Sequence, residues 1–146
     1  MQQKPFVPVL RELARTYQAF ESYSATHIRT LGLTPPQFDI IATLGNTDGM
    51  SFKELGESTL ITKGTLTGVV DRLVAKNLVR RTASPSDGRS QIAQLTPEGE
   101  ALFAQAFPAH LNHVEQAFKN FSRSDLSDIE AALQRLRQAL AAASSQ

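Results

Sequence analysis

The side chains best suited to specific chemistry lie between Ser51 and Thr96. Lys63, Thr65 and Thr67 follow one another near the start of a predicted helix. Arginines occupy the hairpin predicted after it. Lysine can donate to guanine or to phosphate, and threonine can hydrogen-bond a base or touch a thymine methyl group. Such residues serve recognition of a double-stranded DNA surface, and we expect double-stranded DNA as a partner.

Two short helices and a hairpin must position these donors. Ser51 and Glu54 form a capping-box pattern that begins a helix ending near Ser58. Thr62 is the expected cap of the next helix, which ends before a left-handed Asn77. Its apolar residues follow the spacing of one buried helical face: Leu66, Val69, Val70, Leu73 and Val74.

Two strand-like segments follow, residues 78–82 and 91–95. The connection between them contains the turn formers Pro85, Asp87 and Gly88, so it predicts a hairpin. Arg80 and Arg81 alternate across the first strand, and we expect only one of them to face phosphates.

The flanking segments predict long helices. One covers residues 9–31 and ends at Gly32, and a second begins at the capping-box pattern Thr34-x-x-Gln37 and breaks at residues 45–49. Thr96 and Ser122 are expected to cap two further helices, the first kinked by Pro108. The first helix and the last two carry more apolar surface than the middle of the chain can cover, which favours a dimer.

Composition sets limits on the function. The chain has 146 residues, enough for one domain with a substantial core. Its net charge is +1, but residues 53–97 hold seven basic and four acidic side chains, a local excess of +3. Local charge sets the field that a phosphate backbone experiences. No membrane span or signal peptide is evident, so we expect a cytoplasmic protein, and the absence of cysteine excludes thiol chemistry.

The joint pattern resembles the MarR family of bacterial winged helix-turn-helix transcriptional regulators. Residues 51–57, the run Asp71-Arg72-Leu73 and then residues 78–79 match the family's helix-turn-helix without a gap. The most specific mark is Asp87-x-Arg89, followed by residues 95–96 and by the glycine at 99. A second landmark is Leu31-x-Leu33-Thr34-x-x-Gln37. The resemblance covers nearly the whole chain, with departures at Asn77, Pro36 and Pro108.

The resemblance implies a fold class and a function. The fold is mainly α with a small β-hairpin wing. It forms a single domain over 1–146, with a DNA-binding lobe at 34–96 and dimerisation helices at 6–31 and 97–143. The implied function is that of a homodimeric repressor of a pseudo-palindromic operator, relieved by a small aromatic or phenolic ligand. Half-sites should lie about 10–10.5 base pairs apart.

The DNA-binding residues follow from the helix-turn-helix geometry and the resemblance together. The wing's Arg89 should enter a narrow minor groove. The resemblance implies that Asp87 holds Arg89 or Arg72 in place through a charge-assisted pair. The full expected set is Ser51, Lys53, Lys63, Thr65, Thr67, Arg72, Arg81, Asp87 and Arg89.

The effector site is expected in a cleft between the dimerisation helices and the DNA-binding lobe. Candidate lining residues are Tyr17, Phe20, Tyr23, His27 and Phe38, although these side chains could instead be core or dimer contacts. The lack of cysteine and tryptophan disfavours the family's thiol-based peroxide sensors and its urate-binding branch.

Two alternatives stay open. His110 and His113 lie three positions apart on one predicted helix and could bind zinc with His27, Glu115 or Glu21, giving a metal-responsive regulator. A winged helix can also bind a protein instead of DNA. No enzymatic constellation or cofactor motif stands out, so we expect no enzyme activity and no cofactor.

Overall fold

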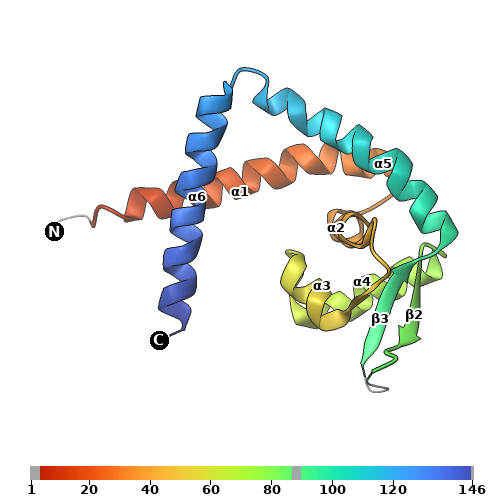
Figure 1. Ribbon diagram of the computed structural model, residues 1–146. Coiled ribbons are helices and arrows are strands. Elements are labelled where there is room, and N and C mark those ends of the chain that lie inside the picture. The colour runs from red at the N-terminus through yellow and green to blue at the C-terminus, as the bar shows by residue number, and fades with distance from the viewer. Residues whose placement is uncertain (1–3, 87–89, 146) are drawn as a thin grey trace. The chain divides into compact units, whose positions relative to one another are not determined.

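The computed structural model describes residues 4–86 and 90–145. Its elements in chain order are α1 (Val7–Ile28), η1 (Arg29–Leu31), α2 (Pro35–Leu44), β1 (Met50–Ser51), α3 (Phe52–Ser58), α4 (Lys63–Ala75), β2 (Val79–Ala83), β3 (Gln91–Leu95), α5 (Pro97–Glu115), η2 (Gln116–Phe118) and α6 (Arg123–Ser144) (Figure 1). This arrangement confirms the expected mainly helical fold with a hairpin wing. The chain divides into two compact units, residues 1–114 and 115–146, each described by itself.

Capping boxes begin α2 and α3, as their sequence patterns predict, and the cap predicted at Ser122 is also a capping box, completed by Asp125. At α3, for example, the Glu54 amide donates to Ser51 Oγ at 3.0 Å, while the Ser51 amide donates to Glu54 Oε1 at 3.3 Å. The cap predicted at Thr62 is only half correct. Thr62 occupies the N-cap position of α4, but its hydroxyl lies 3.0 Å from the Thr65 hydroxyl and makes no capping bond.

The helix ends follow the predicted left-handed residues. Gly32 has φ of 74°, and Asn77 has φ of 60°. The first helix is shorter than its apolar pattern predicts, since α-helical geometry ends at Ile28 and a 3₁₀ turn covers 29–31. Pro108 lies inside α5, which continues through it to Glu115.

The sheet has three antiparallel strands in the order β1-β3-β2. β2 and β3 form the expected hairpin, with Val79 opposite Leu95 and Ala83 opposite Gln91. The sequence did not predict β1, whose Met50 pairs with Ala93 and whose Ser51 pairs with Ile92. β1 therefore fastens the start of α3 to the base of the wing.

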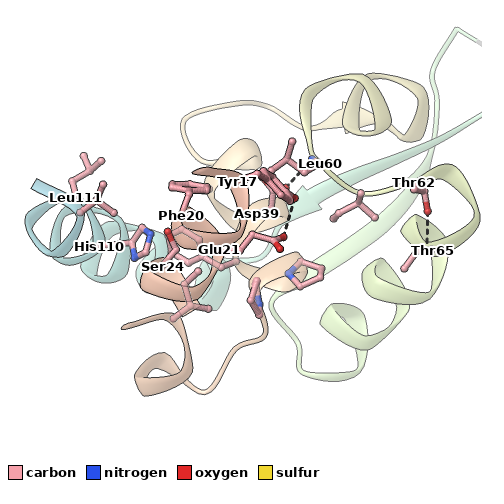
Figure 2. A pocket seen from close by; sticks show the side chains of 17 residues that line it. Tyr17, Phe20, Glu21, Ser24, Asp39, Leu60, Thr62, Thr65, His110 and Leu111 are labelled. Carbon is pink, nitrogen blue, oxygen red and sulfur yellow. Dashed lines mark hydrogen bonds between the residues drawn. The ribbon is translucent and has the colours of Figure 1, made fainter. Parts of the chain in front are cut away.

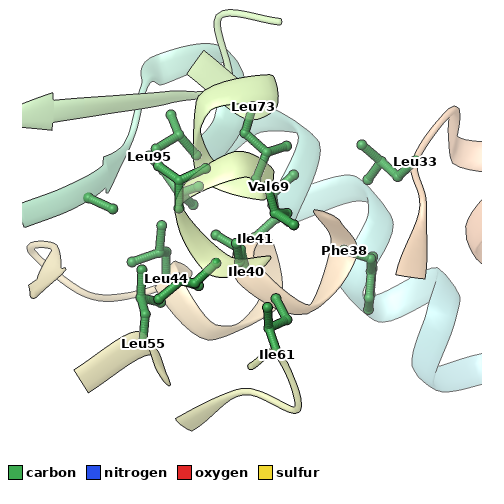
Figure 3. Close-up of a cluster of buried hydrophobic side chains, with 14 of the residues drawn as sticks. Leu33, Phe38, Ile40, Ile41, Leu44, Leu55, Ile61, Val69, Leu73 and Leu95 are labelled. Atoms are coloured by element: carbon green, nitrogen blue, oxygen red, sulfur yellow. The ribbon is translucent and has the colours of Figure 1, made fainter. Parts of the chain in front are cut away.

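The hydrophobic core lies mainly between α2, α3, α4 and the sheet, and Ile28 of α1 and Ala106 of α5 complete it (Figure 3). Its largest fully buried side chains are Ile40, Ile41, Leu44, Leu55, Val70, Leu73 and Val79. Burying one such side chain contributes about 1.5–3 kcal/mol, so the buried inner face of α4 supplies most of its packing energy. The opposite face of α4 remains available to solvent.

Specific hydrogen bonds connect the ends of these elements. Thr96 Oγ1 donates to the Asn77 carbonyl oxygen at 2.7 Å and accepts from the Gly99 amide at 3.0 Å, which joins the end of α4 to the start of α5. At Gly99 a Cβ atom would lie 2.1 Å from the Leu78 carbonyl oxygen, so only glycine fits there. Lys76 Nζ donates to the Gly32 carbonyl oxygen at 2.9 Å.

The second unit consists mainly of α6, in which no residue is buried. Its exposed apolar residues include Leu126, Ile129, Leu133 and Leu140, which share the stripe expected from the sequence. Over the described parts of the chain, no helix is both long enough and apolar enough to cross a bilayer.

Candidate nucleic-acid interface and ligand cleft

The predicted DNA-contacting residues of α4 lie on its outer face. Leu66, Val69, Val70 and Leu73 are buried, whereas Lys63, Thr65 and Thr67 are exposed. Gly64, between Lys63 and Thr65, and Gly68, directly after Thr67, are equally open, because a Cβ atom at either position would meet nothing within 4 Å. The protein's own packing therefore does not require glycine there, and the first two turns of α4 present a surface of low relief.

α3 supplies two of the predicted phosphate contacts. Lys53 is exposed in its first turn. The Ser51 hydroxyl accepts the capping bond from Glu54, and its own proton remains available to another acceptor. The N-terminus of α3 carries the positive end of the helix dipole, which favours an anion.

The wing's arginines are more constrained than the sequence predicts. The Arg81 guanidinium pairs with Asp71 of α4, donates to Gln91 Oε1 at 2.6 Å and lies 5.1 Å from the centre of the Phe52 ring. Arg80 Nε donates to Gln94 Oε1 at 3.1 Å on the neighbouring strand. Arg81 therefore links the wing to α3 and α4, a role that sequence reasoning missed.

The tip of the wing cannot be compared with its prediction. Asp87 and Arg89 lie outside the described residues, and so does the predicted pairing of Asp87 with Arg89 or Arg72. Arg72 itself is exposed on α4, and no salt bridge joins it to another described residue.

A cleft of about 530 Å³ lies between α1, α2, the α3–α4 turn and α5 (Figure 2). Its lining is Tyr17, Phe20, Glu21, Ser24, Ile28, Pro35, Pro36, Phe38, Asp39, Ala42, Leu60, Ile61, Thr62, Thr65, His110, Leu111 and Val114. Three of the five predicted ligand residues, Tyr17, Phe20 and Phe38, are among them. A mostly apolar cleft with a few polar groups is typical of small-molecule sites.

Two carboxyl groups give the cleft its polarity. The Tyr17 hydroxyl donates to Glu21 Oε1 at 2.8 Å, and this bond, followed by burial and by the charges of Glu21 and Asp39, raises the pKa of Tyr17. Asp39 Oδ2 accepts the Leu60 amide at 3.0 Å. Burial raises the pKa of Asp39, and the bond from Leu60 partly opposes that effect.

Residues 31–90 match the sequence model of the MarR family. The HTH-type transcriptional regulator MhqR of Bacillus subtilis is 30% identical over 124 residues, which cover 85% of this chain and 86% of that protein. The chain belongs to the MarR family.

Solved structures of other regulators share the fold. BpsR of Bordetella bronchiseptica, whose DNA binding is regulated by 6-hydroxynicotinic acid, superposes with a TM-score of 0.81 at 25% identity, over 94% of this chain and 98% of that one. A MarR family regulator from Streptomyces coelicolor, solved in complex with DNA, superposes with a TM-score of 0.84 at 23% identity, over 96% of this chain and 91% of that one. This chain is thus a DNA-binding transcriptional regulator of the MarR type.

The other two ligand residues predicted for this MarR-type chain, Tyr23 and His27, do not line the cleft. The Tyr23 hydroxyl donates to the His113 carbonyl oxygen at 2.6 Å, and its ring stacks on His113 with centroids 4.2 Å apart. His27 Nδ1 lies 3.0 Å from His110 Nδ1. Both side chains point from α1 to α5, so they fasten these two helices together.

The histidines proposed as metal ligands form part of this contact. The His27 ring lies 5.2 Å from that of His110 and 5.3 Å from that of His113, measured between centroids. Burial, followed by the neighbouring His27 and His113, lowers the pKa of His110, which favours its neutral form. Within residues 4–86 and 90–145, no group of three or more His, Asp or Glu side chains is arranged to hold a metal ion.

Sequence reasoning missed the polar residues of the cleft. The sequence predicts Glu21 only as a metal ligand and gives no role to Ser24 or Asp39. The helical spacing of residues 17, 20, 21 and 24 on α1 is the signal that could have found two of them, because these positions share one face.

Proposed function

We propose that this MarR-family regulator is a homodimeric repressor whose two α4 helices enter the major groove at the half-sites of a pseudo-palindromic operator. The observation that carries the proposal is the outer face of α4, where Lys63, Thr65 and Thr67 are exposed beside two glycines at which an added Cβ would meet no described atom within 4 Å. A recognition helix places its N-terminal residues against base edges, and these are the N-terminal residues of α4.

Each element has a separate task in this proposal. Lys63 and the two threonines contact bases, and Ser51 and Lys53 contact phosphates at the N-terminus of α3. Arg89 enters the minor groove, while Arg81, through Asp71 and Phe52, holds the base of the wing against α3 and α4. Phosphate contacts fix the register, and base contacts supply the specificity.

The dimer is proposed from exposed apolar surface. α1 and the residue before it expose Phe6, Val9, Leu10 and Leu13, and α6 exposes the stripe described above. Extended apolar faces of this kind mark association sites on soluble domains. The oligomeric state is measured by light scattering after size-exclusion chromatography, and a monomer at working concentrations would contradict this part of the proposal.

Ligand control is proposed because the first turn of α4 belongs both to the cleft and to the DNA-binding face. Thr62 and Thr65 at the start of α4 line the cleft, and Thr65 also belongs to the outer face (Figure 2). A ligand shifts an equilibrium only through its different affinity for two states. A ligand seated against this turn favours an α4 position that fits DNA less well, so it releases the operator.

The test is a titration of the protein with the intergenic DNA upstream of its own gene, with unrelated duplex as competitor, at two salt concentrations. Each phosphate contact contributes about −0.9 to the slope of log K against log salt. Lys63→Ala, which removes a base contact, should weaken binding to the operator, and Lys53→Ala, which removes a phosphate contact, should reduce that slope by about 1. Lys119→Ala, which removes an exposed lysine of the second unit, is the matched control.

Arg89→Ala tests the wing. It should weaken operator binding and leave the dimer intact, since only a minor-groove contact is lost. Unchanged affinity for the operator would refute the role given to Arg89. Binding with no preference over competitor, at the upstream region and in random-site selection, would contradict sequence-specific regulation and favour a winged helix that binds protein.

A further inference from the structure

One hydroxyl group in the cleft lacks a partner. Ser24 is only 5% exposed, and its Oγ is a buried side-chain oxygen with no hydrogen-bond partner among the described residues. It lies on α1 next to Phe20 and His110 in Figure 2 and belongs to the cleft lining. Buried polar groups are nearly always hydrogen-bonded, so an unpartnered hydroxyl on a side chain that lines a cleft indicates a place for a ligand's polar group.

The charge of the cleft restricts what that ligand can be. Glu21 and Asp39 both line it, and no Lys or Arg is present among the described residues of the lining. His110 contributes little positive charge, because its surroundings favour the neutral imidazole. An anion would therefore meet carboxylates with no cation to offset them, whereas a cation would meet favourable partners.

The polar groups are close enough to act together. Glu21 and Ser24 are three positions apart on one face of α1, a spacing that brings helical side chains together. Figure 2 shows Glu21 and Asp39 both beside Tyr17, and the charges of both contribute to the raised pKa of Tyr17. Around them the walls are largely aromatic and aliphatic, with Phe20, Phe38 and Leu111.

We propose that the effector of this regulator is an aromatic compound carrying a protonated amine. An ammonium group has three N–H donors and no acceptor, so it can donate to Ser24 Oγ and to the carboxylates of Glu21 and Asp39 together. The ring packs against the aromatic walls. This inference rests on the ligand control proposed above and names the class of ligand. It is opposite in charge to the aromatic acid that regulates BpsR.

The experiment compares three probes that share an indole ring: tryptamine, a cation; tryptophol, which is neutral; and indole-3-acetate, an anion. The chain contains no tryptophan, so fluorescence anisotropy excited beyond the tyrosine band reports only the probe. Tryptamine should bind about ten-fold or more tightly than indole-3-acetate, the ratio expected for one charge-assisted hydrogen bond. Equal or tighter binding of indole-3-acetate, or binding of none of the three at millimolar concentration, overturns the proposal.

Variants locate the site. Glu21→Gln and Asp39→Asn should each reduce the preference for tryptamine over indole-3-acetate, and Ser24→Ala should weaken tryptamine binding. Glu12→Gln and Ser22→Ala change exposed residues of α1 outside the cleft lining and should leave binding unchanged. Thermal unfolding of each variant verifies its fold. Tryptamine affinity that is the same in all three folded cleft variants overturns the assignment.

The proposed ligand class and the proposed ligand control of DNA binding can be contradicted independently of each other. Adding tryptamine to the protein bound to its operator tests ligand control. Site-specific binding of tryptamine that leaves the operator complex intact supports the ligand class and contradicts ligand control. Release of the operator by indole-3-acetate with no effect of tryptamine supports ligand control and overturns the ligand class.

Discussion

Removing the Ser24 hydroxyl should make the free protein more stable. A buried hydroxyl without a partner carries a desolvation cost of about 1–3 kcal/mol, and Ser24 fits that description because its Oγ has no partner and the residue is 5% exposed. Alanine also favours a helix over serine by about 0.5 kcal/mol. We therefore expect Ser24→Ala to raise the free energy of unfolding by about 1.5–3.5 kcal/mol.

Ser22→Ala is the matched control, because Ser22 is exposed on the same helix. Its free energy of unfolding should rise only by the difference in helix propensity between alanine and serine, about 0.5 kcal/mol. The assay is urea unfolding followed by circular dichroism at one fixed protein concentration, since a dimer's stability depends on concentration. If Ser24→Ala is no more stable than Ser22→Ala, the Ser24 hydroxyl has a partner in solution, and the orphan that supports the ligand assignment does not exist.

Three further predictions concern α4, the α4–α5 connection and the histidines. Gly68→Ala should raise the free energy of unfolding by about 1 kcal/mol, because the added Cβ meets open space within a helix. The same substitution should weaken operator binding measured by fluorescence anisotropy, and unchanged affinity would show that DNA does not approach this position closely. Gly99→Ala should lower the free energy of unfolding by more than about 2 kcal/mol in urea, since its Cβ would overlap the Leu78 carbonyl oxygen, and a near-neutral effect would contradict that contact. The pKa of His110 in the folded protein lies below its ordinary value of 6.5. Between these two pKa values the unfolded chain binds more protons than the folded protein. The contribution of His110 to stability is therefore complete above pH 6.5 and decreases as the pH falls from 6.5 toward the folded pKa. His110→Gln should flatten the dependence of the urea midpoint on pH between about 7 and 5.5, whereas an unaltered slope would assign it to other groups.

Features with local causes could be predicted from the sequence. The capping boxes at Thr34 and Ser51 are each set by side chains three positions apart, and the left-handed Asn77 ends α4 through its own backbone preference. The outer face of α4 followed from apolar periodicity alone. In each case the deciding contacts lie within one turn of helix.

Features that depend on distant partners could not be predicted. β1 is only two residues long and exists because β3 pairs with it. Arg81 has the same side chain as any phosphate-binding arginine, and only folding brings Asp71 and Phe52 to it. Tyr23 and His27 were assigned to the cleft because they are aromatic residues on the correct helix. Their direction was decided by His110 and His113, more than 80 residues further along the chain.

Thr65 connects the two surfaces of this molecule, and that connection limits how such a regulator can diverge. If the proposed operator contact and ligand control hold, a substitution at Thr65 that suits a new operator also reshapes one end of the cleft, so a duplicate gene that acquires a different target inherits a changed response to its effector. Selection for a new effector is less restricted at Ser24, Glu21 and Asp39, which lie on α1 and α2, away from the outer face of α4. In this lineage, the repertoire of effectors should therefore diversify more readily than the repertoire of operators.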